Sequence, residues 1–159
     1  MDRRALRLHN YDAILAEAAA LLASGYDRVG SWGLGQVCHH LAAVMEQSLD
    51  GFPSRSPWPV RLVARWFVLG RVLRHRVFRR RFPAPTFLQP PAVSDDREGL
   101  DRLRAAVERL KSHAGPMQPS PVFGRLSPGQ WREVHLWHCE HHLSFLLPKA
   151  SSIRSRDKR

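Results

Sequence analysis

Apolar residues recur at the spacing of an amphipathic helix in several separate stretches of this chain. Between residues 11 and 23, one helical face collects Ile14, Leu15, Ala18, Leu21 and Leu22. Between residues 31 and 50, one face collects Leu34, Val37, Cys38, Leu41 and Met45. Gly25 follows the first run, and Gly51 and Pro53 follow the second, as is typical of helix ends. The pattern therefore predicts two helices in the first third of the chain.

A third stretch, residues 58 to 80, also has helical spacing, but its apolar face is wider. Its apolar positions are Leu62, Val63, Trp66, Phe67, Leu69, Gly70, Val72, Leu73 and Val77. We predict a third helix there. The connector that follows, residues 82 to 94, contains four prolines that each disfavour a helix, so we expect it to be extended or irregular.

Capping signals precede two further helices. Ser94 is the predicted N-cap of a helix that runs to about His113, because acidic residues crowd the first turn after it and favour the positive end of the helix dipole. Ser127 and Pro128 have the residue types expected at an N-cap and at the first helical position. They predict a final helix from about Gly129 to Leu147.

Five helical segments without an alternating strand pattern predict an all-α protein. The first, second, fourth and fifth have the length and amphipathicity of a four-helix bundle, and the basic third segment lies within a long crossover connection. We expect one bundle domain over residues 1 to 148. Residues 149 to 159 lack apolar periodicity, and we expect a disordered basic tail there.

The composition is that of a globular domain. The chain has 159 residues, of which 43% are hydrophobic and 25% are charged. Its two cysteines do not make a disulfide framework, and no apolar run approaches the roughly 18 residues of a membrane span. Asp12 and Glu17 interrupt the first apolar stretch, so we interpret it as an amphipathic helix rather than a signal peptide. We expect a cytoplasmic protein.

The formal net charge of +11 is concentrated in two segments. Residues 51 to 94 contain nine arginines and no acidic residue, and residues 149 to 159 add a net charge of +4. The remainder of the chain therefore carries −2. The basicity is a local property and does not describe the whole protein.

The basic segment supports one hypothesis of function. Its arginines alternate with aromatic side chains, so the predicted helix over residues 58 to 81 can contact the phosphates of a nucleic acid or lie along an anionic membrane surface. The candidate anion-binding residues are Arg74, Arg76, Arg79, Arg80 and Arg81. The alternative is a helix that covers one side of the bundle, with its aromatic side chains buried and its arginines solvated.

Histidines support a second hypothesis, since six of the nine fall within residues 38 to 40 and 135 to 142. His138 and His142 are four residues apart, and at that spacing one helix can offer two imidazoles to a single metal ion. A third ligand must come from another helix. His40 lies beside the apolar stripe of the second helix, whereas His39 lies on its more polar face, so His40 is the better candidate.

The residue pattern leaves other interpretations open. The histidines can be packing residues, and His135 and His141 lie in the same helix and serve a different face equally well. Cys139 is a candidate thiol ligand or a buried side chain. Glu46 and Glu140 are the acids nearest in sequence, and we expect both to be solvated. Trp32 and Gln36 either orient or cap the second helix.

Three strings occur in a specific order: SWGLGQVCHHLA at 31 to 42, PVFGRLSPGQW at 121 to 131 and HCEHHLSFLLP at 138 to 148. In these strings the chain resembles a DinB-like (YfiT-like) branch, domain of unknown function family 1569. The resemblance implies a DinB/YfiT-like four-helix bundle that holds a divalent ion, such as zinc, nickel or manganese, through three histidines. Carried onto this chain, the ligands are His40, His138 and His142.

The resemblance also implies what the site does. Three neutral imidazoles leave coordination positions open, as in a catalytic rather than a structural site. Some members of the superfamily act as thiol-dependent transferases or isomerases, so a low-molecular-weight thiol is a candidate co-substrate beside an unknown small-molecule substrate. Similar proteins are commonly homodimers. The resemblance assigns no reaction and no catalytic residue to this branch, and a catalytically silent bundle with a structural metal is the remaining alternative.

Overall fold

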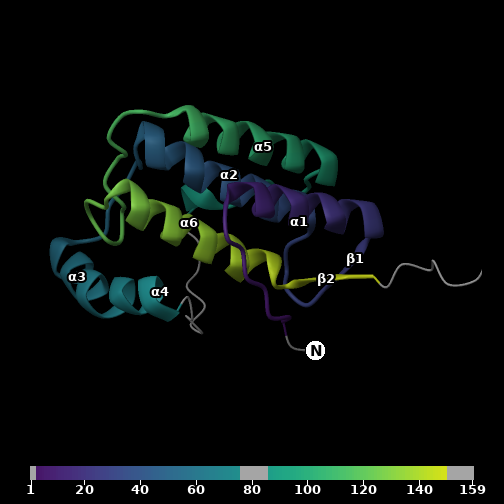
Figure 1. The fold of residues 1–159 in the computed structure, drawn as a ribbon, viewed down its shortest axis with the longest axis horizontal. Coiled ribbons are helices and arrows are strands. Elements are labelled where there is room, and N and C mark those ends of the chain that lie inside the picture. The colour runs from purple at the N-terminus through teal and green to yellow at the C-terminus, as the bar shows by residue number, and fades with distance from the viewer. Residues whose placement is uncertain (1–2, 76–85, 150–159) are drawn as a thin grey trace, which may run out of the picture.

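Most of the described chain is helical, as the pattern predicts. The computed structural model describes residues 3–75 and 86–149. Its longer helices α1 (Tyr11–Ser24), α2 (Leu34–Asp50), α5 (Asp96–Ser112) and α6 (Pro128–Leu143) pack against one another (Figure 1). A short antiparallel ribbon of β1 (Tyr26–Arg28) and β2 (Leu146–Pro148) is added to them. The all-α prediction is therefore confirmed as a fold class.

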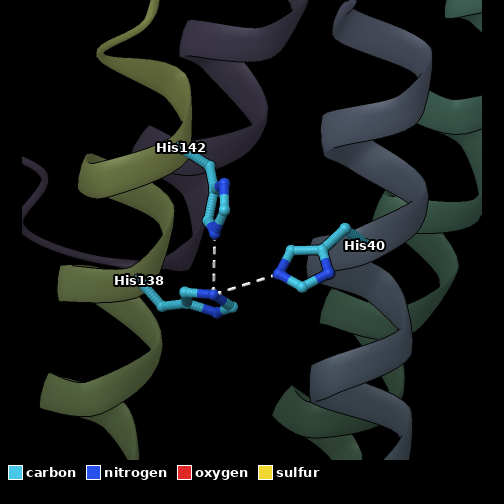
Figure 2. A group of neighbouring side chains, drawn as sticks. All are labelled: His40, His138 and His142. Carbon is cyan, nitrogen blue, oxygen red and sulfur yellow. Dashed lines mark hydrogen bonds between the residues drawn. The ribbon is translucent and has the colours of Figure 1, made fainter. Parts of the chain in front are cut away.

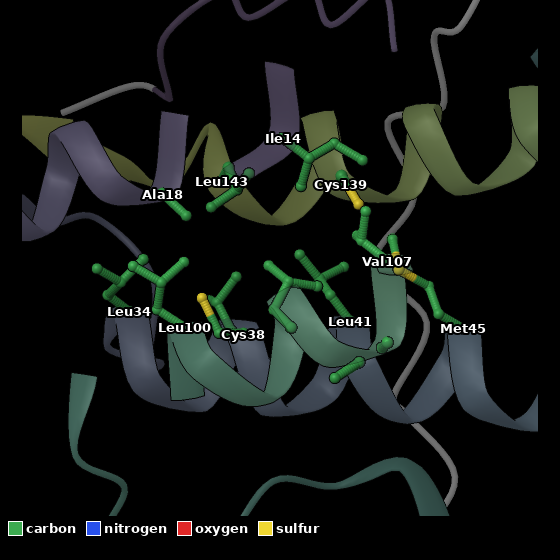
Figure 3. Close-up of a cluster of buried hydrophobic side chains, with 14 of the residues drawn as sticks. Ile14, Ala18, Leu34, Cys38, Leu41, Met45, Leu100, Val107, Cys139 and Leu143 are labelled. Atoms are coloured by element: carbon green, nitrogen blue, oxygen red, sulfur yellow. The ribbon is translucent and has the colours of Figure 1, made fainter. Parts of the chain in front are cut away.

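An apolar core lies between these four helices. Figure 3 shows side chains of α1 and α6 facing side chains of α2 and α5. The core includes Ile14, Ala18, Leu21, Leu34, Val37, Leu41, Met45, Leu100, Leu103, Val107, Leu136 and Leu143. In α1 and α2 these residues are the apolar stripes that the sequence spacing identifies, and α5 and α6 bury apolar residues against them. Burial of the stripes therefore orders the four helices.

The start of α6 is the one that the sequence predicts. The Ser127 hydroxyl accepts a hydrogen bond from the Gln130 amide at 3.2 Å, and the Gln130 side chain accepts one from the Ser127 amide at 3.0 Å. Pro128 is the first helical residue. The predicted cap of α5 is wrong by one residue, because the carboxylate of Asp95, and not Ser94, accepts hydrogen bonds from the amides two and three residues later.

The end of α6 also differs from the prediction. The helix ends at Leu143 rather than at Leu147, because the chain then joins β2, which pairs with β1. The side chain of Leu146 is buried in the core from this strand. An apolar run that looks like a continuing helix therefore belongs to a strand whose partner lies more than 100 residues earlier in the chain.

Helix α2 starts at Leu34 rather than near Ser31. The Gly33 amide donates to the side-chain oxygen of Gln36 at 3.1 Å, and the Leu34 amide donates to the Tyr26 hydroxyl at 2.8 Å. These bonds satisfy two of the amides that the start of a helix leaves free. The side-chain amide of Gln36 donates in turn to the backbone carbonyls of residues 91 and 92. Gln36 therefore caps α2 and ties it to the Pro-rich connector.

The basic crossover is helical in its described part. It comprises α3 (Trp58–Val63), the π-helix η1 (Ala64–Leu69) and α4 (Gly70–His75), followed after residues 76–85 by the 3₁₀ turn η2 (Thr86–Leu88). Because hydrogen bonds in a π-helix join residues five apart, the buried Ala64 and Leu69 lie on the same side. Both pack against Trp131 and Val134 of α6.

Parts of the predictions for this segment are wrong or lie outside the described residues. Trp58, Trp66 and Phe67 are exposed, so they do not pack onto the bundle as the covering alternative requires. The part of the predicted helix beyond His75 lies outside the described residues, and so do Phe78, Phe82, Arg76, Arg79, Arg80 and Arg81. The predicted tail at residues 150–159 lies outside them as well.

Within residues 3–75 and 86–149, no helix has the length and apolar character needed to cross a membrane.

Helices α2 and α5 approach each other backbone to backbone. A Cβ atom added to Gly35 would lie 2.6 Å from the Asp95 carbonyl oxygen, and one added to Gly99 would lie 2.6 Å from the Gly35 carbonyl oxygen. Real Cβ atoms do not come so close to backbone atoms, which cannot rotate away as a side chain can. The hydrogen bond from the Gly35 amide to the Asp96 carboxylate, at 2.7 Å, closes the same contact. Glycine is therefore required at both positions.

We expect Gly99→Ala to destabilise the protein by about 1–3 kcal/mol, because the added methyl group forces α2 and α5 apart. Gly70→Ala is the matched control, since a Cβ there meets nothing within 4 Å. On helix propensity alone it should stabilise by roughly 0.5–1 kcal/mol. Urea unfolding followed by circular dichroism measures both changes, and a Gly99→Ala protein as stable as Gly70→Ala would contradict the close approach.

Candidate metal centre

Three histidines from two helices bring their ring nitrogens together (Figure 2). His40 comes from α2, and His138 and His142 come from α6. The Nε2 atom of His138 lies 3.2 Å from Nε2 of His40 and 3.0 Å from Nε2 of His142. The ligand atoms of all three residues lie within 4.8 Å of one another. The structure thus brings together the three histidines that the sequence selected.

The two helices position these rings by simple periodicity. His138 and His142 are one turn apart on α6, so their side chains leave the helix on the same face. His40 lies on the α2 face that is buried in the protein, and its side chain is only 3% exposed. Because α2 and α6 pack side by side, the imidazole of His40 meets the pair on α6.

The tautomer of His40 follows from its hydrogen bond to the backbone. Its Nδ1 atom lies 2.7 Å from the carbonyl oxygen of Leu88 in η2. A carbonyl only accepts, so Nδ1 carries the proton and donates it. In the neutral ring, Nε2 then presents a lone pair to the other two histidines. A histidine that ligates a metal commonly donates its other N–H to a carbonyl in this way.

Neutral imidazoles can satisfy both short contacts only if a single proton on Nε2 of His138 is shared between His40 and His142. Because Nε2 of His40 presents a lone pair and no proton, a hydrogen bond with His138 requires that Nε2 of His138 carry a proton. A protonated Nε2 of a neutral ring has no lone pair left to accept a hydrogen bond from His142. A cation shared by the three nitrogens removes the need for this shared proton. Nitrogens that bind one zinc ion at about 2.0–2.1 Å in tetrahedral geometry are separated by roughly 3.3 Å, which is near the distances from Nε2 of His138 to Nε2 of His40 and of His142.

The electrostatics of the site keep the rings neutral. Burial lowers the pKa of His138 well below its ordinary value, and the adjacent His142 and His40 lower it further. Burial and the neighbouring His40 and His141 likewise lower the pKa of His142. Burial lowers the pKa of His40 despite the opposing effect of its hydrogen bond to Leu88. At neutral pH the three rings are therefore uncharged, each with one nitrogen free of a proton, as metal ligands must be.

Trp32 forms one wall of the site. Its indole stacks on His142 with a centroid distance of 5.5 Å and an interplanar angle of 16°, and it lies 5.0 Å from the ring of His40. His138 and His142 remain partly exposed, in contrast to the buried His40. The nitrogens are therefore sheltered by Trp32 on one side and are not fully enclosed.

The other histidines of these two strings are held elsewhere. His39, expected on the more polar face of α2, is buried beside α5, where Arg102 Nη1 lies 3.1 Å from its Nδ1. The Nδ1 atom of His135 lies 3.1 Å from the Tyr11 hydroxyl, and His141 Nδ1 lies 3.0 Å from Arg3 Nη1. None of them belongs to the three-histidine group. The structure thus separates His138 and His142 from His135 and His141.

The expectation that Glu140 and Glu46 are solvated is wrong. Glu140 is buried and accepts a hydrogen bond from the Leu8 amide at 2.8 Å, because the N-terminal segment crosses α6 at this point. Glu46 is half-buried and accepts two hydrogen bonds from the guanidinium of Arg102, at 3.2 and 2.7 Å. Both carboxylates are thus bonded away from the three histidines.

Both cysteines are free and buried in the core of the four helices. Burial raises the pKa of the Cys38 thiol to about 12, and it raises the pKa of Cys139 well above the ordinary value. A thiol that resists ionisation is a poor nucleophile and a poor metal ligand. Cys139 is therefore a packing residue in this structure, and it lies outside the three-histidine group.

Sequence reasoning did not identify the Leu88 carbonyl or the stacking of Trp32. The carbonyl belongs to the Pro-rich connector, and no side-chain pattern indicates which backbone group will face a histidine. Trp32 was noted beside the start of α2, but its contact with His142 joins residues 110 positions apart. The available sequence signal for Trp32 was that it belongs to the same string as His40, at residues 31 to 42.

A family model described as "Protein of unknown function (DUF1569)" matches residues 1–149. Searches of curated proteins and of solved structures find no match to the chain.

The stability of the metal-free protein should fall as the pH decreases below about 6.5, and His135 should account for part of the fall. Burial lowers the pKa of His135 to about 3. As the pH falls, the unfolded chain therefore binds a proton on this residue near pH 6.5, whereas the folded chain binds it only near pH 3. Each such histidine costs at most about 1.4 kcal/mol per pH unit. Urea unfolding of wild type and of Tyr11→Phe/His135→Phe, in the presence of a chelator, measures this slope.

The double variant removes both members of the Tyr11–His135 contact, so neither is left unpaired. Its stability should depend on pH less steeply than that of wild type, by about one proton between pH 6 and pH 4. The exposed His113→Gln is the control of the same residue type. Parallel profiles for wild type and the double variant would show that His135 is not buried in its neutral form.

Proposed function

The chain belongs to the DUF1569 family, and from its site we propose that it is an enzyme that depends on a divalent metal ion held by His40, His138 and His142. The observation that carries the proposal is the convergence of three Nε2 atoms. That of His40 presents a lone pair, because Nδ1 of the same ring donates its proton to the Leu88 carbonyl. Packing alone gives no reason for three neutral imidazoles to direct nitrogens at one point.

The donor set favours particular ions. All three donors are imidazole nitrogens, which suit zinc and nickel, whereas manganese prefers carboxylate and water oxygens. Glu46 and Glu140 are bonded elsewhere and contribute no oxygen. Zinc and nickel are therefore better supported than manganese among the three candidate ions.

The partial exposure of His138 and His142 supports a catalytic rather than a structural role. Three protein ligands leave a coordination position for water or substrate, whereas a structural zinc site is closed by four. When bound, the ion supplies Lewis acidity to an oxygen or sulfur donor at that position. The chain's own contribution is to hold three neutral rings, orient His40 through Leu88 and limit solvent access with Trp32.

We further propose that the four packed helices form a four-helix bundle of the DinB/YfiT type. One histidine on the second long helix and two on the last, separated by one turn, support this assignment, as does the crossover between α2 and α5. The likeness extends the proposal to a substrate class, with a low-molecular-weight thiol as co-substrate in transferase or hydrolase-type chemistry.

The purified protein should bind about one zinc or nickel ion per chain, and His138→Ala/His142→Ala should bind none. His40→Ala should weaken binding by more than the roughly 10- to 100-fold cost of losing a partner that only orients a ligand. Calorimetric titration of chelator-treated protein measures both. His141→Ala, on the same helix but outside the group, should keep full stoichiometry. No uptake of zinc, nickel or manganese by wild type would overturn the proposal.

Substitution with cobalt(II) should distinguish a catalytic from a structural site. A position open to ligands allows a small thiol such as 2-mercaptoethanol to bind the ion, so the visible spectrum of the cobalt protein should change in a saturable way with thiol concentration. A site closed by a fourth protein ligand would give a spectrum that the thiol leaves unchanged. That second result would agree with a metal site but would reject the proposal that the protein is an enzyme.

A further inference from the structure

The crossover carries an apolar surface that faces away from the rest of the protein. Among the residues that the structure describes, large apolar side chains are exposed mainly between residues 58 and 67. They are Trp58, Val60, Leu62, Val63, Trp66 and Phe67, called the crossover patch below. Trp58, Trp66 and Phe67 are 71%, 74% and 76% exposed. Single exposed apolar residues are common, but a contiguous group marks an interaction site.

The crossover patch lies on a different side of the segment from the residues that pack against α6. Ala64 and Leu69 pack against α6, and Val72 is buried as well. Trp58, Leu62 and Trp66 follow one another at four-residue spacing on the outer side, as do Val63 and Phe67. The segment is therefore apolar on two sides, and the described residues cover only one of them.

Positive charge accompanies the patch. Residues 51 to 94 contain nine arginines and no acidic residue. Of those described, Arg55, Arg71 and Arg74 are exposed, whereas the exposed Arg65 donates hydrogen bonds to the carbonyls of Phe123 and Arg125. Exposed tryptophan and phenylalanine flanked by exposed arginines form the composition of a segment that lies in a membrane interface.

We propose that the crossover patch binds the surface of an anionic lipid membrane, with Trp58, Trp66 and Phe67 inserted among the headgroups and Arg71 and Arg74 against lipid phosphates. The segment lies flat on the surface and does not cross it, in accord with the short length of α3, η1 and α4. The segment lies at the end of α6 opposite to β2 (Figure 1). The three-histidine site therefore stays on the body of the protein, away from the membrane contact.

Two other occupants fit these observations less well. Aromatic rings can stack on bases, but Val60, Leu62 and Val63 have no ring to stack and would be buried against charged phosphates in a nucleic acid complex. A second copy of the chain, docked through the same face, would bring two segments with nine arginines each and no acid into contact. An anionic membrane supplies both an apolar interior for the patch and negative charge for the arginines.

Co-sedimentation of the full-length protein with lipid vesicles tests the proposal. Binding to vesicles of phosphatidylcholine mixed with phosphatidylglycerol should exceed binding to phosphatidylcholine alone, and it should weaken at high salt. Trp66→Ser/Phe67→Ser should reduce partitioning at least about tenfold on the mixed vesicles. Arg71→Gln/Arg74→Gln should reduce it by roughly fivefold for each charge removed.

Matched controls isolate the patch. Val93→Ser/Val122→Ser removes two exposed apolar side chains elsewhere, and Arg28→Gln/Arg97→Gln removes the same charge from exposed sites on β1 and α5. Both controls should bind vesicles like wild type. Because Trp66 and Phe67 are exposed, their variant should fold, and an unchanged circular dichroism spectrum and an unchanged urea unfolding curve would verify this.

Each remaining outcome overturns the proposal. Failure of wild type to bind the mixed vesicles, or equal binding by the patch variants and the controls, rejects it directly. Salt-dependent binding to duplex DNA without vesicle binding would assign the arginines to nucleic acid. A dimer in analytical ultracentrifugation that Trp66→Ser/Phe67→Ser dissociates, without vesicle binding, would assign the patch to a second copy. None of these results depends on whether the three histidines bind metal.

Discussion

Helix α2 must meet two neighbours at once, and the candidate site depends on that requirement. On one side its backbone touches α5 at Gly35 and Gly99, where no side chain fits. On another side it directs His40 toward the pair of histidines on α6. The contact with α5 fixes the position of α2. The position of α2 in turn fixes where the imidazole of His40 lies relative to the two histidines of α6. A metal site formed by side chains of two helices is only as well placed as the packing of those helices.

Much of this architecture could be read from the sequence because it is local. The apolar stripes of α1, α2 and α5 are periodic, and α6 is marked by its start, where Ser127 is followed by Pro128. His40 could be preferred to His39 because helical phase places His40 beside the apolar stripe and His39 on a different face of α2. His138 and His142 could be paired because the spacing of four residues is a property of one helix.

The features that sequence analysis got wrong or did not see depend on contacts between distant segments. Leu147 looks helical until β1 is known to pair with β2. Glu140 looks solvated until the N-terminal segment is seen to cross α6 and donate the Leu8 amide to it. The carbonyl of Leu88 has no pattern that announces it. The exposure of Trp66 and Phe67 could not be inferred either, because an apolar face reads the same in sequence whether or not another element covers it.

The ribbon of β1 and β2 has a consequence for how the protein folds during synthesis. Tyr26 pairs with Pro148, so this contact closes a loop that contains most of the domain. His40 and His142 are 102 residues apart and are likewise joined only across that loop. A chain made from its N-terminus can form α1 and α2 early, but the three-histidine cluster cannot assemble until α6 has left the ribosome, and the ribbon must wait for β2. Assembly of the three-histidine cluster is thus a late, whole-domain event, and an incomplete chain presents His40 without its partners.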